Sequence, residues 1–156
     1  MVKRFLLAAV AVVLGFGVVV AAEAIKLELK DFKLKAAFDG GEALVGHDEA
    51  ENRLFLYTNG SATCEVKALE DGEYTIKIQA GCTEADKEKA KIKLSVGDVV
   101  VKDKFELTAE DSKEYTFTAK LKKGDAKLVV EFLNDKYKEN EYDLNFYLYA
   151  VSLEKK

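Results

Sequence analysis

The residues best suited to chemistry lie in one short segment near the carboxyl-terminal end of the chain. Asn134-Asp135 closes one expected strand, and Asp143 and Asn145 open the next. If two strands leave the same edge of a sheet there, these four oxygen-bearing side chains converge. Calcium takes about six to eight oxygens from carboxylates, amides and backbone carbonyls. The spacing therefore predicts a calcium site on the 134–145 loop, with Asp135 and Asp143 as its principal ligands.

Acidic crowding in the loop supports the same prediction. Four acids lie within nine residues, and a divalent cation would relieve their repulsion: Asp135, Glu139, Glu141 and Asp143. Asn134 and Asn145 are further candidate ligands, although either could instead hold the loop through backbone hydrogen bonds. Loop carbonyls and a distant acid, for which Glu28 is the candidate, would complete the shell. Because Asn and Asp also favour turns, the alternative is a polar hairpin loop without metal.

The chain carries no recognisable catalytic motif. Its single histidine, His47, lacks a second histidine four residues on, so the zinc-protease pattern fails. Neither a G-x-S-x-G elbow nor a glycine-rich phosphate loop is present. With 28 acidic residues, a pair of carboxylates is uninformative. We therefore expect a protein without catalytic activity.

Strands must position these residues, because several runs alternate apolar and polar side chains with a period of two. The alternation predicts strands over 73–80, 91–96, 115–121, 128–132 and 144–150. Turn signals separate them, at Asn59-Gly60, Asp71-Gly72, Gly97-Asp98 and Lys123-Gly124-Asp125. The 83–90 segment lacks an apolar stripe and is expected to be a loop or one helical turn. This pattern predicts an all-β sandwich or barrel.

The first 24 residues have the order of a secretory signal. Lys3-Arg4 precedes an apolar run, and Ala22-Glu23-Ala24 offers a small-x-small cleavage pattern, with Val20-Ala21-Ala22 as a second option. The alternative is an uncleaved membrane anchor, since the 18-residue run from 5 to 22 is just long enough to span a bilayer. We expect an exported protein, secreted, periplasmic or at the cell surface, with one domain over residues 25–156.

Export changes how the two cysteines are interpreted. Cys64 and Cys82 would enter an oxidising compartment, where an even number favours a disulfide. Because both flank the turn at Asp71-Gly72, we expect a Cys64–Cys82 disulfide, with two unpaired buried thiols as the alternative. The net charge of −4 argues against a nucleic-acid partner, since phosphate contacts need a basic face.

The last two expected strands carry a recognisable motif. Phe132-Leu133-Asn134-Asp135 is followed by a loop and then by Asp143-Leu144-Asn145-Phe146-Tyr147-Leu148. This resembles the calcium-dependent xylan-binding carbohydrate-binding modules, whose last strands read F-x-N-D and D-R-N-L-x-V. Weaker similarity extends over most of residues 25–156, beginning at Leu27-Glu28-Leu29, where family members often place an acid. The resemblance implies a jelly-roll β-sandwich with calcium at a loop edge, where the ion contacts sugar hydroxyls directly.

The motif departs from the family pattern at two places. Leu144 stands where the family has arginine, and Glu141-Tyr142 stands where glycine is usual before the aspartate. Loss of the arginine could alter the packing under the site or the ligand that is bound.

The resemblance implies non-catalytic, calcium-dependent binding of an extracellular polysaccharide, xylan-like in kind. Tryptophan is absent, so stacking on sugar rings would rely on tyrosine or phenylalanine. Tyr137 and Tyr142 lie in the same loop as the expected calcium ligands and are the candidate ligand-binding residues, unless both rings pack over the loop. One alternative is an exported structural or adhesion domain, with calcium only for stability or no metal. Another is a small glycan-active enzyme.

Overall fold

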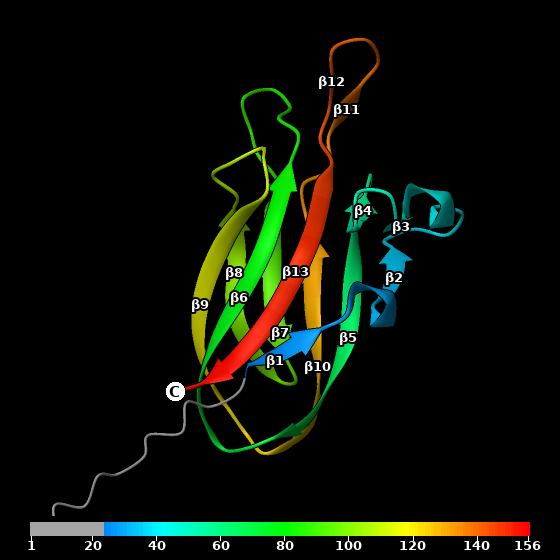
Figure 1. Ribbon diagram of the computed structural model, residues 1–156. Helices are drawn as coiled ribbons and strands as arrows, with labels where there is room; N and C mark the ends of the chain where they lie inside the picture. The colour runs from blue at the N-terminus through cyan, green and yellow to red at the C-terminus, as the bar shows by residue number, and fades with distance from the viewer. Residues whose placement is uncertain (1–23) are drawn as a thin grey trace, which may run out of the picture.

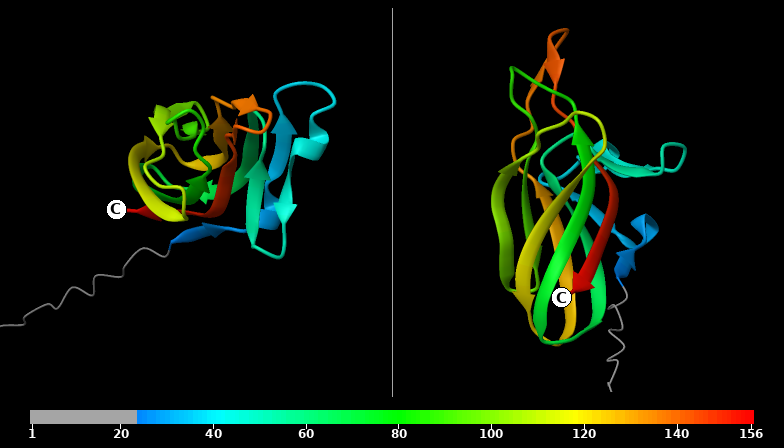
Figure 2. Two further views of the ribbon diagram at one scale, coloured as in Figure 1. Left: turned by 90° about the horizontal axis from the view of Figure 1, so that it is seen from above. Right: turned by 60° about the vertical axis from the view of Figure 1, so that its left-hand side comes forward.

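The structure is a computed structural model that describes residues 24–156. Two antiparallel sheets pack face to face around the core (Figures 1 and 2). The segment predicted to be a signal or an anchor falls almost wholly in residues 1–23, outside the described part of the chain. From residue 24 onward, no helix is both long and apolar enough to cross a bilayer.

The first sheet has six strands in the order β3-β4-β13-β6-β9, with β1 also paired to β13. Its strands are β1 (Ile25–Leu27), β3 (Val45–Asp48), β4 (Arg53–Leu56), β6 (Gly72–Cys82), β9 (Lys113–Leu121) and β13 (Phe146–Lys155). The second sheet has five strands in the order β2-β5-β10-β7-β8. They are β2 (Lys33–Ala36), β5 (Gly60–Leu69), β7 (Lys91–Val96), β8 (Val99–Glu106) and β10 (Gly124–Phe132).

The remaining elements are short and lie outside the two sheets. They are the hairpin β11 (Tyr137–Lys138) and β12 (Tyr142–Asp143), and the 3-10 helices η1 (Leu29–Asp31) and η2 (Glu42–Leu44). The 83–90 segment contains no helical turn, and Ala85 and Glu88 instead form an isolated antiparallel bridge. It is therefore a loop, as the missing apolar stripe indicated.

The five strands predicted from alternation are confirmed as β6, β7, β9, β10 and β13. In β6, Tyr74, Ile76, Ile78 and Ala80 are buried in the core, while Lys77 and its polar neighbours face outward. Each strand of the sandwich covers one side of the core, so every second side chain must be apolar. The period of two in the sequence is the direct result of this constraint.

Phe132 and Phe146 join the two sheets at one end of the sandwich. Phe132 ends β10 in the second sheet, and Phe146 begins β13 in the first. Both rings are almost completely buried and stack with their centroids 6.0 Å apart. The connection between them, residues 133–145, therefore crosses over the end of the core from one sheet to the other.

The two ends of the described chain lie away from this connection. β1 pairs with the last part of β13, where Ile25 faces Leu153. Figure 1 shows the carboxyl terminus at the lower end of the sandwich and the β11–β12 hairpin at the upper end.

The structure corrects the expected disulfide, because Cys64 and Cys82 are both free and buried. The turn at Asp71-Gly72 does not close a hairpin. It carries the chain from β5 in one sheet to β6 in the other. Cys64 lies opposite Leu128 on β10, and Cys82 lies opposite Phe146 on β13. Each thiol contacts a different carbonyl oxygen, that of Glu65 at 3.7 Å and that of Ala109 at 3.6 Å.

We predict that both thiols are inert in the folded protein. Burial raises the pKa of the Cys64 and Cys82 thiols, and the thiolate is the reactive form. Titration of the native protein with a chromogenic disulfide reagent at neutral pH should find no fast-reacting thiol. In unreduced protein unfolded with guanidinium, the same reagent should find two. A count of none after unfolding would restore the disulfide.

Candidate metal and ligand site

The 133–145 connection is shaped as a small hairpin that stands on the end of the sandwich. β11 and β12 pair with Tyr137 opposite Asp143, and the tip turns at Asn140, which has a positive φ of 59°. Asn tolerates this left-handed conformation better than most residues. This pairing brings the stretch around residue 135 close to residue 143, although the two residues are eight positions apart in the chain.

Asp135 and Asp143 line a single hollow of about 420 Å³. The Oδ1 atom of Asp135 is buried and has no hydrogen-bond partner. Burial, and then the nearby negative charge of Asp143, raise the pKa of Asp135, while the Thr58 hydroxyl opposes the rise. A buried acceptor without a partner, next to a second carboxylate, is a costly arrangement in the absence of a cation.

Asn145 belongs to the same group of oxygens. Its side chain is only 8% exposed, and its Nδ2 donates to Oδ2 of Asp143 at 3.1 Å. Its Oδ1 is also buried without a partner. Two unpartnered buried oxygens therefore lie at or beside the aspartate pair. Such oxygens are expected where a bound ion takes the place of a hydrogen-bond donor.

The donor set consists of few charged groups. Within residues 24–156, no cluster of three or more carboxylate, imidazole or thiol groups is arranged to hold a metal. Two carboxylates and the Asn145 amide oxygen fit a hard cation in their chemistry, but the shell would need other oxygens. Loop carbonyls, water or the hydroxyls of a bound ligand are the remaining sources.

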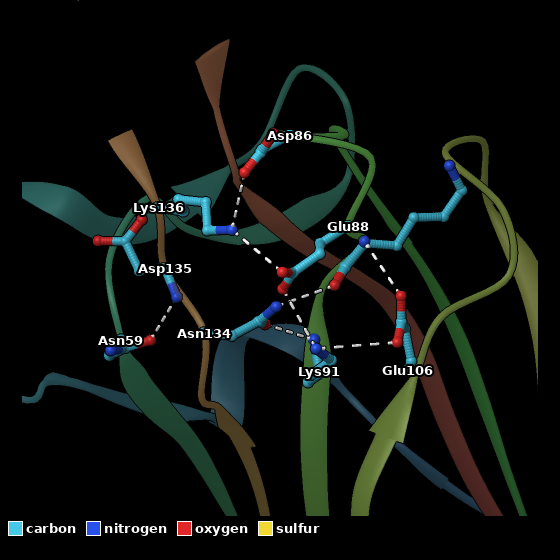
Figure 3. Close-up of polar contacts among 9 residues, drawn as sticks. Asn59, Asp86, Glu88, Lys91, Glu106, Asn134, Asp135 and Lys136 are labelled. Atoms are coloured by element: carbon cyan, nitrogen blue, oxygen red, sulfur yellow. Dashed lines mark hydrogen bonds and ion pairs between the residues drawn. The ribbon is translucent and has the colours of Figure 1, made fainter. Parts of the chain in front are cut away.

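Asn134 has the structural role that was the alternative to ligation. Its Oδ1 accepts from the Lys91 N–H at 2.6 Å, and its Nδ2 donates to the Lys89 carbonyl at 3.0 Å. Both ends of the amide are therefore bonded to the chain just before and at the start of β7, as Figure 3 shows. Asn134 fixes the start of the loop to the second sheet.

Glu28 lies away from the aspartate pair. It lines a separate hollow of about 350 Å³, together with Asn52, Gln79 and Tyr149. Leu27, the residue before it, faces Val151, which is six positions along β13 from Asn145. The structure therefore does not bring Glu28 together with Asp135 and Asp143.

The two tyrosines of the loop have different environments. Tyr137 is 68% exposed and lines the hollow. Tyr142 is partly buried and packs against the hydrophobic core. Tyr137 is thus available to a ligand, and Tyr142 has the packing role that was the alternative for both rings.

Three further side chains that line the hollow were not identified from the sequence: Phe38, Leu44 and Tyr57. With Tyr137, they make up four of the five large hydrophobic side chains that are exposed in residues 24–156. Tyr57 stacks on Phe55 at 4.5 Å and meets the Tyr147 ring edge-on at 6.3 Å. Exposed apolar groups gathered at one hollow mark a binding surface.

Thr83 holds the Asp143–Asn145 segment in place. Its hydroxyl donates to the Asp143 carbonyl at 2.5 Å and accepts from the Asn145 N–H at 2.7 Å. Its own N–H donates to the Asn145 carbonyl at 3.1 Å. Between these peptides, the Leu144 side chain is completely buried. Leu144, which replaces the arginine of the family motif, therefore extends the core under the site.

Ion pairs join the 83–90 loop to the other flank of the site. Lys136 contacts Glu88 at 3.1 Å and Asp86 at 3.6 Å (Figure 3). Lys136 and Lys91 together lower the pKa of Glu88. The Asn59 Oδ1 accepts from the Asp135 N–H at 2.7 Å. Exposed pairs are individually weak, so it is their number around one loop that restrains residues 134–136.

The fold is that of the jelly-roll carbohydrate-binding modules, which confirms the predicted jelly-roll sandwich. A CBM36 module solved in complex with calcium and xylotriose is similar at a TM-score of 0.61 and 17% identity, over 83% of this chain and 98% of that one. The CBM36-1 domain of a multidomain xylanase from the hindgut metagenome of Trinervitermes trinervoides is similar at a TM-score of 0.62 and 10% identity, over 86% of this chain and 98% of that one. A family 35 carbohydrate-binding module from Clostridium thermocellum is similar at a TM-score of 0.58 and 11% identity, over 86% of this chain and 100% of that one.

The sequence itself identifies the family. Residues 75–156, just over half of the chain, match the family model CBM60, described as a Ca-dependent carbohydrate-binding module that binds xylan. The chain belongs to this family. No curated protein matches the sequence.

We predict that removing the Thr83 hydroxyl disturbs the site more than the fold. Thr83→Val keeps the shape but leaves the Asn145 N–H and the Asp143 carbonyl without their partner. Loss of such partners costs roughly 1–3 kcal/mol. Calcium titration should show about tenfold weaker binding in Thr83→Val, while Thr83→Ser should bind as the wild type does. If Thr83→Val melts at a lower temperature without calcium but keeps its calcium affinity, the residue has only a structural role.

Proposed function

We propose that this protein is a non-catalytic module that binds an extracellular, xylan-like polysaccharide in a calcium-dependent manner. One observation carries the proposal. A single hollow contains two aspartates, one with an unpartnered buried oxygen, and four exposed apolar side chains. Carboxylates without cationic partners suit a metal, and exposed rings suit the faces of sugars.

Asp135 and Asp143 would hold the calcium ion, with the Asn145 amide as a further oxygen donor. Bound calcium would supply open coordination positions for pairs of sugar hydroxyls. Tyr137 and Tyr57 would contact a sugar ring through their apolar faces, and Phe38 and Leu44 would exclude water from one side. The aspartates line the same hollow as these apolar side chains, so hydroxyl recognition and ring contact would occur on the same sugar.

We further propose that residues 1–24 act as the export signal and that the exported domain begins near Ile25. Ile25 is the first residue of β1, which pairs with β13. Cleavage after Ala24 would therefore leave every sheet pairing of the domain intact. Amino-terminal sequencing of exported protein should find Ile25 or a close neighbour, whereas recovery of an intact Met1 end in membranes would favour an anchor.

Calcium should stabilise the folded protein. An ion that binds only the folded state adds roughly 2.7 kcal/mol at a concentration 100 times its Kd. Differential scanning calorimetry with calcium and with chelator should show this as a higher melting temperature. Asp143→Asn should lose the shift, and Asp103→Asn, an exposed acid on β8, should keep it. An unmoved wild-type melting curve would remove the metal from the proposal.

The calcium effect should also depend on pH in a defined direction. Folding raises the pKa of Asp135. Between the ordinary pKa of an aspartate and this raised pKa, the ion-free folded protein therefore binds more protons than the unfolded chain does. The contribution of Asp135 to stability is therefore greatest at low pH and is lost as pH rises through the folded pKa. Protons compete with calcium for Asp135. The calcium-induced rise in melting temperature should thus be largest near neutral pH and shrink on acidification, beginning above the ordinary pKa of an aspartate.

Polysaccharide binding is tested by native affinity electrophoresis in gels containing soluble xylan. Calcium should retard the protein and chelator should release it. Tyr137→Ala and Tyr57→Ala should each weaken binding by roughly tenfold, since stacking contacts contribute about 1 kcal/mol or more. Val100→Ala, which trims an exposed apolar side chain outside the hollow, should have no effect. Stabilisation by calcium without retention of any polysaccharide would favour the structural or adhesion function.

A further inference from the structure

A second hollow lies on the outer face of the five-stranded sheet, where β2, β5 and β10 are neighbours. Its volume is about 640 Å³, larger than that of the aspartate hollow. Lys33 and Lys35 of β2 lie directly opposite Thr63 and Ser61 of β5. Lys127 of β10 lies opposite Glu65. Side chains opposite one another share a face of the sheet, so these residues all line the same side.

The hollow carries an excess of positive charge. Four lysines line it, together with the two acids Asp31 and Glu65: Lys33, Lys35, Lys67 and Lys127. All four are exposed, and none forms an ion pair in residues 24–156. Lysines elsewhere on this sheet, such as Lys91 and Lys93, do pair with carboxylates. A surplus of two positive charges is therefore concentrated in a chain whose net charge is −4.

The hollow is also suited to a sugar. The half-buried hydroxyls of Ser61 and Thr63 lie between the lysines, and Leu34 adds an apolar surface. Lys67 is six positions after Ser61 along β5, which corresponds to about 20 Å of extended strand. Several sugar rings fit along such a length.

The hollow leads toward the aspartate site. A neighbouring hollow of about 390 Å³ shares Lys35 and Ser61 with it and extends to Asn59. The Asn59 side chain in turn accepts the hydrogen bond from the Asp135 N–H. Adjoining hollows therefore extend from the lysines along β5 to Asn59, beside the aspartate site, and Glu131 is the one acid that lines the connecting hollow.

We propose that this lysine hollow is a second subsite, independent of metal, for the carboxylate groups of an acidic polysaccharide. The proposal rests on the proposed function for the polymer, and adds uronic-acid substituents as the feature that is recognised. Carboxylates accept single hydrogen bonds from lysine ammonium groups, and the intervening hydroxyls bond the sugar. The hollow has no arginine and a surplus of only two positive charges, whereas a nucleic-acid backbone with its continuous row of phosphates needs a more basic face.

The test compares glucuronoxylan with the same polymer after its carboxyl groups have been reduced to alcohols. In chelator and low salt, affinity electrophoresis should show retention by glucuronoxylan and none by the reduced polymer. Lys33→Gln combined with Lys127→Gln should weaken this retention by roughly tenfold, because two screened charge contacts are lost. A matched control combines Lys120→Gln with Lys122→Gln, at the end of β9 in the other sheet. It has the same net charge and should bind as the wild type does.

The outcomes separate this inference from the proposed function. Equal retention of the two polymers in chelator, or equal weakening in both double variants, would overturn the lysine subsite. Calcium-dependent binding of the reduced polymer would still support the aspartate site in that case. Conversely, retention of glucuronoxylan that depends on Lys33 and Lys127 but not on calcium would support the subsite while the proposed calcium-dependent function failed.

Discussion

The stacked pair Phe132 and Phe146 is the contact on which the geometry of the site depends. One ring belongs to each sheet, and both are almost fully buried. Removing such a ring from a core costs about 3–5 kcal/mol, far more than any exposed ion pair of the loops. Asn134 follows Phe132 by two residues, and Asn145 directly precedes Phe146. The rigid core therefore sets the distance between the two stems of the hairpin, and weaker contacts only adjust its orientation.

Those weaker contacts come mostly from one neighbour, the 83–90 loop. It supplies the Thr83 hydroxyl on one flank, and Glu88 and Asp86 on the other. Asp86 and Lys87 have positive φ values of 51° and 64°, which are unfavourable for residues with side chains. The chain thus accepts local backbone strain in the loop that supports Asp135 and Asp143, and the Oδ1 atom of Asp135 has no hydrogen-bond partner. With Asn140 at the hairpin tip, these two residues make up half of the six non-glycine residues that have positive φ in residues 24–156.

The sequence was sufficient to predict the sandwich and the proximity of Asp135 and Asp143, because both depend on short-range patterns. Alternation identified β6 and β13, and the ends of two adjacent predicted strands identified Asp135 and Asp143. Phe38, Leu44 and Tyr57 could not be predicted, because they lie next to the ends of β2, β3 and β4 and meet Tyr137 only through the order of the strands in the two sheets. No spacing along the chain encodes that order.

The same limit explains why the expected disulfide and the expected position of Glu28 differ from the structure. A turn at Asp71-Gly72 suggests a hairpin, but the chain crosses there between sheets, so Cys64 and Cys82 are not neighbours. Glu28 follows a strand that pairs with the far part of β13 and not with its start. In both cases the sequence correctly indicated the turn or the strand itself, but it could not show which strand lies next to it.

The placement of β1 and the end of β13 has a mechanical consequence. Both ends of the described chain lie toward one end of the sandwich, and the β11–β12 hairpin lies at the other (Figure 1). Tyr137 and Asp143 of this hairpin line the aspartate hollow. Anything joined to either end, whether a membrane segment or a second protein, would be held behind the hollow. The module would then act as a rigid spacer about one β-strand long, which presents the aspartate hollow outward from whatever carries it.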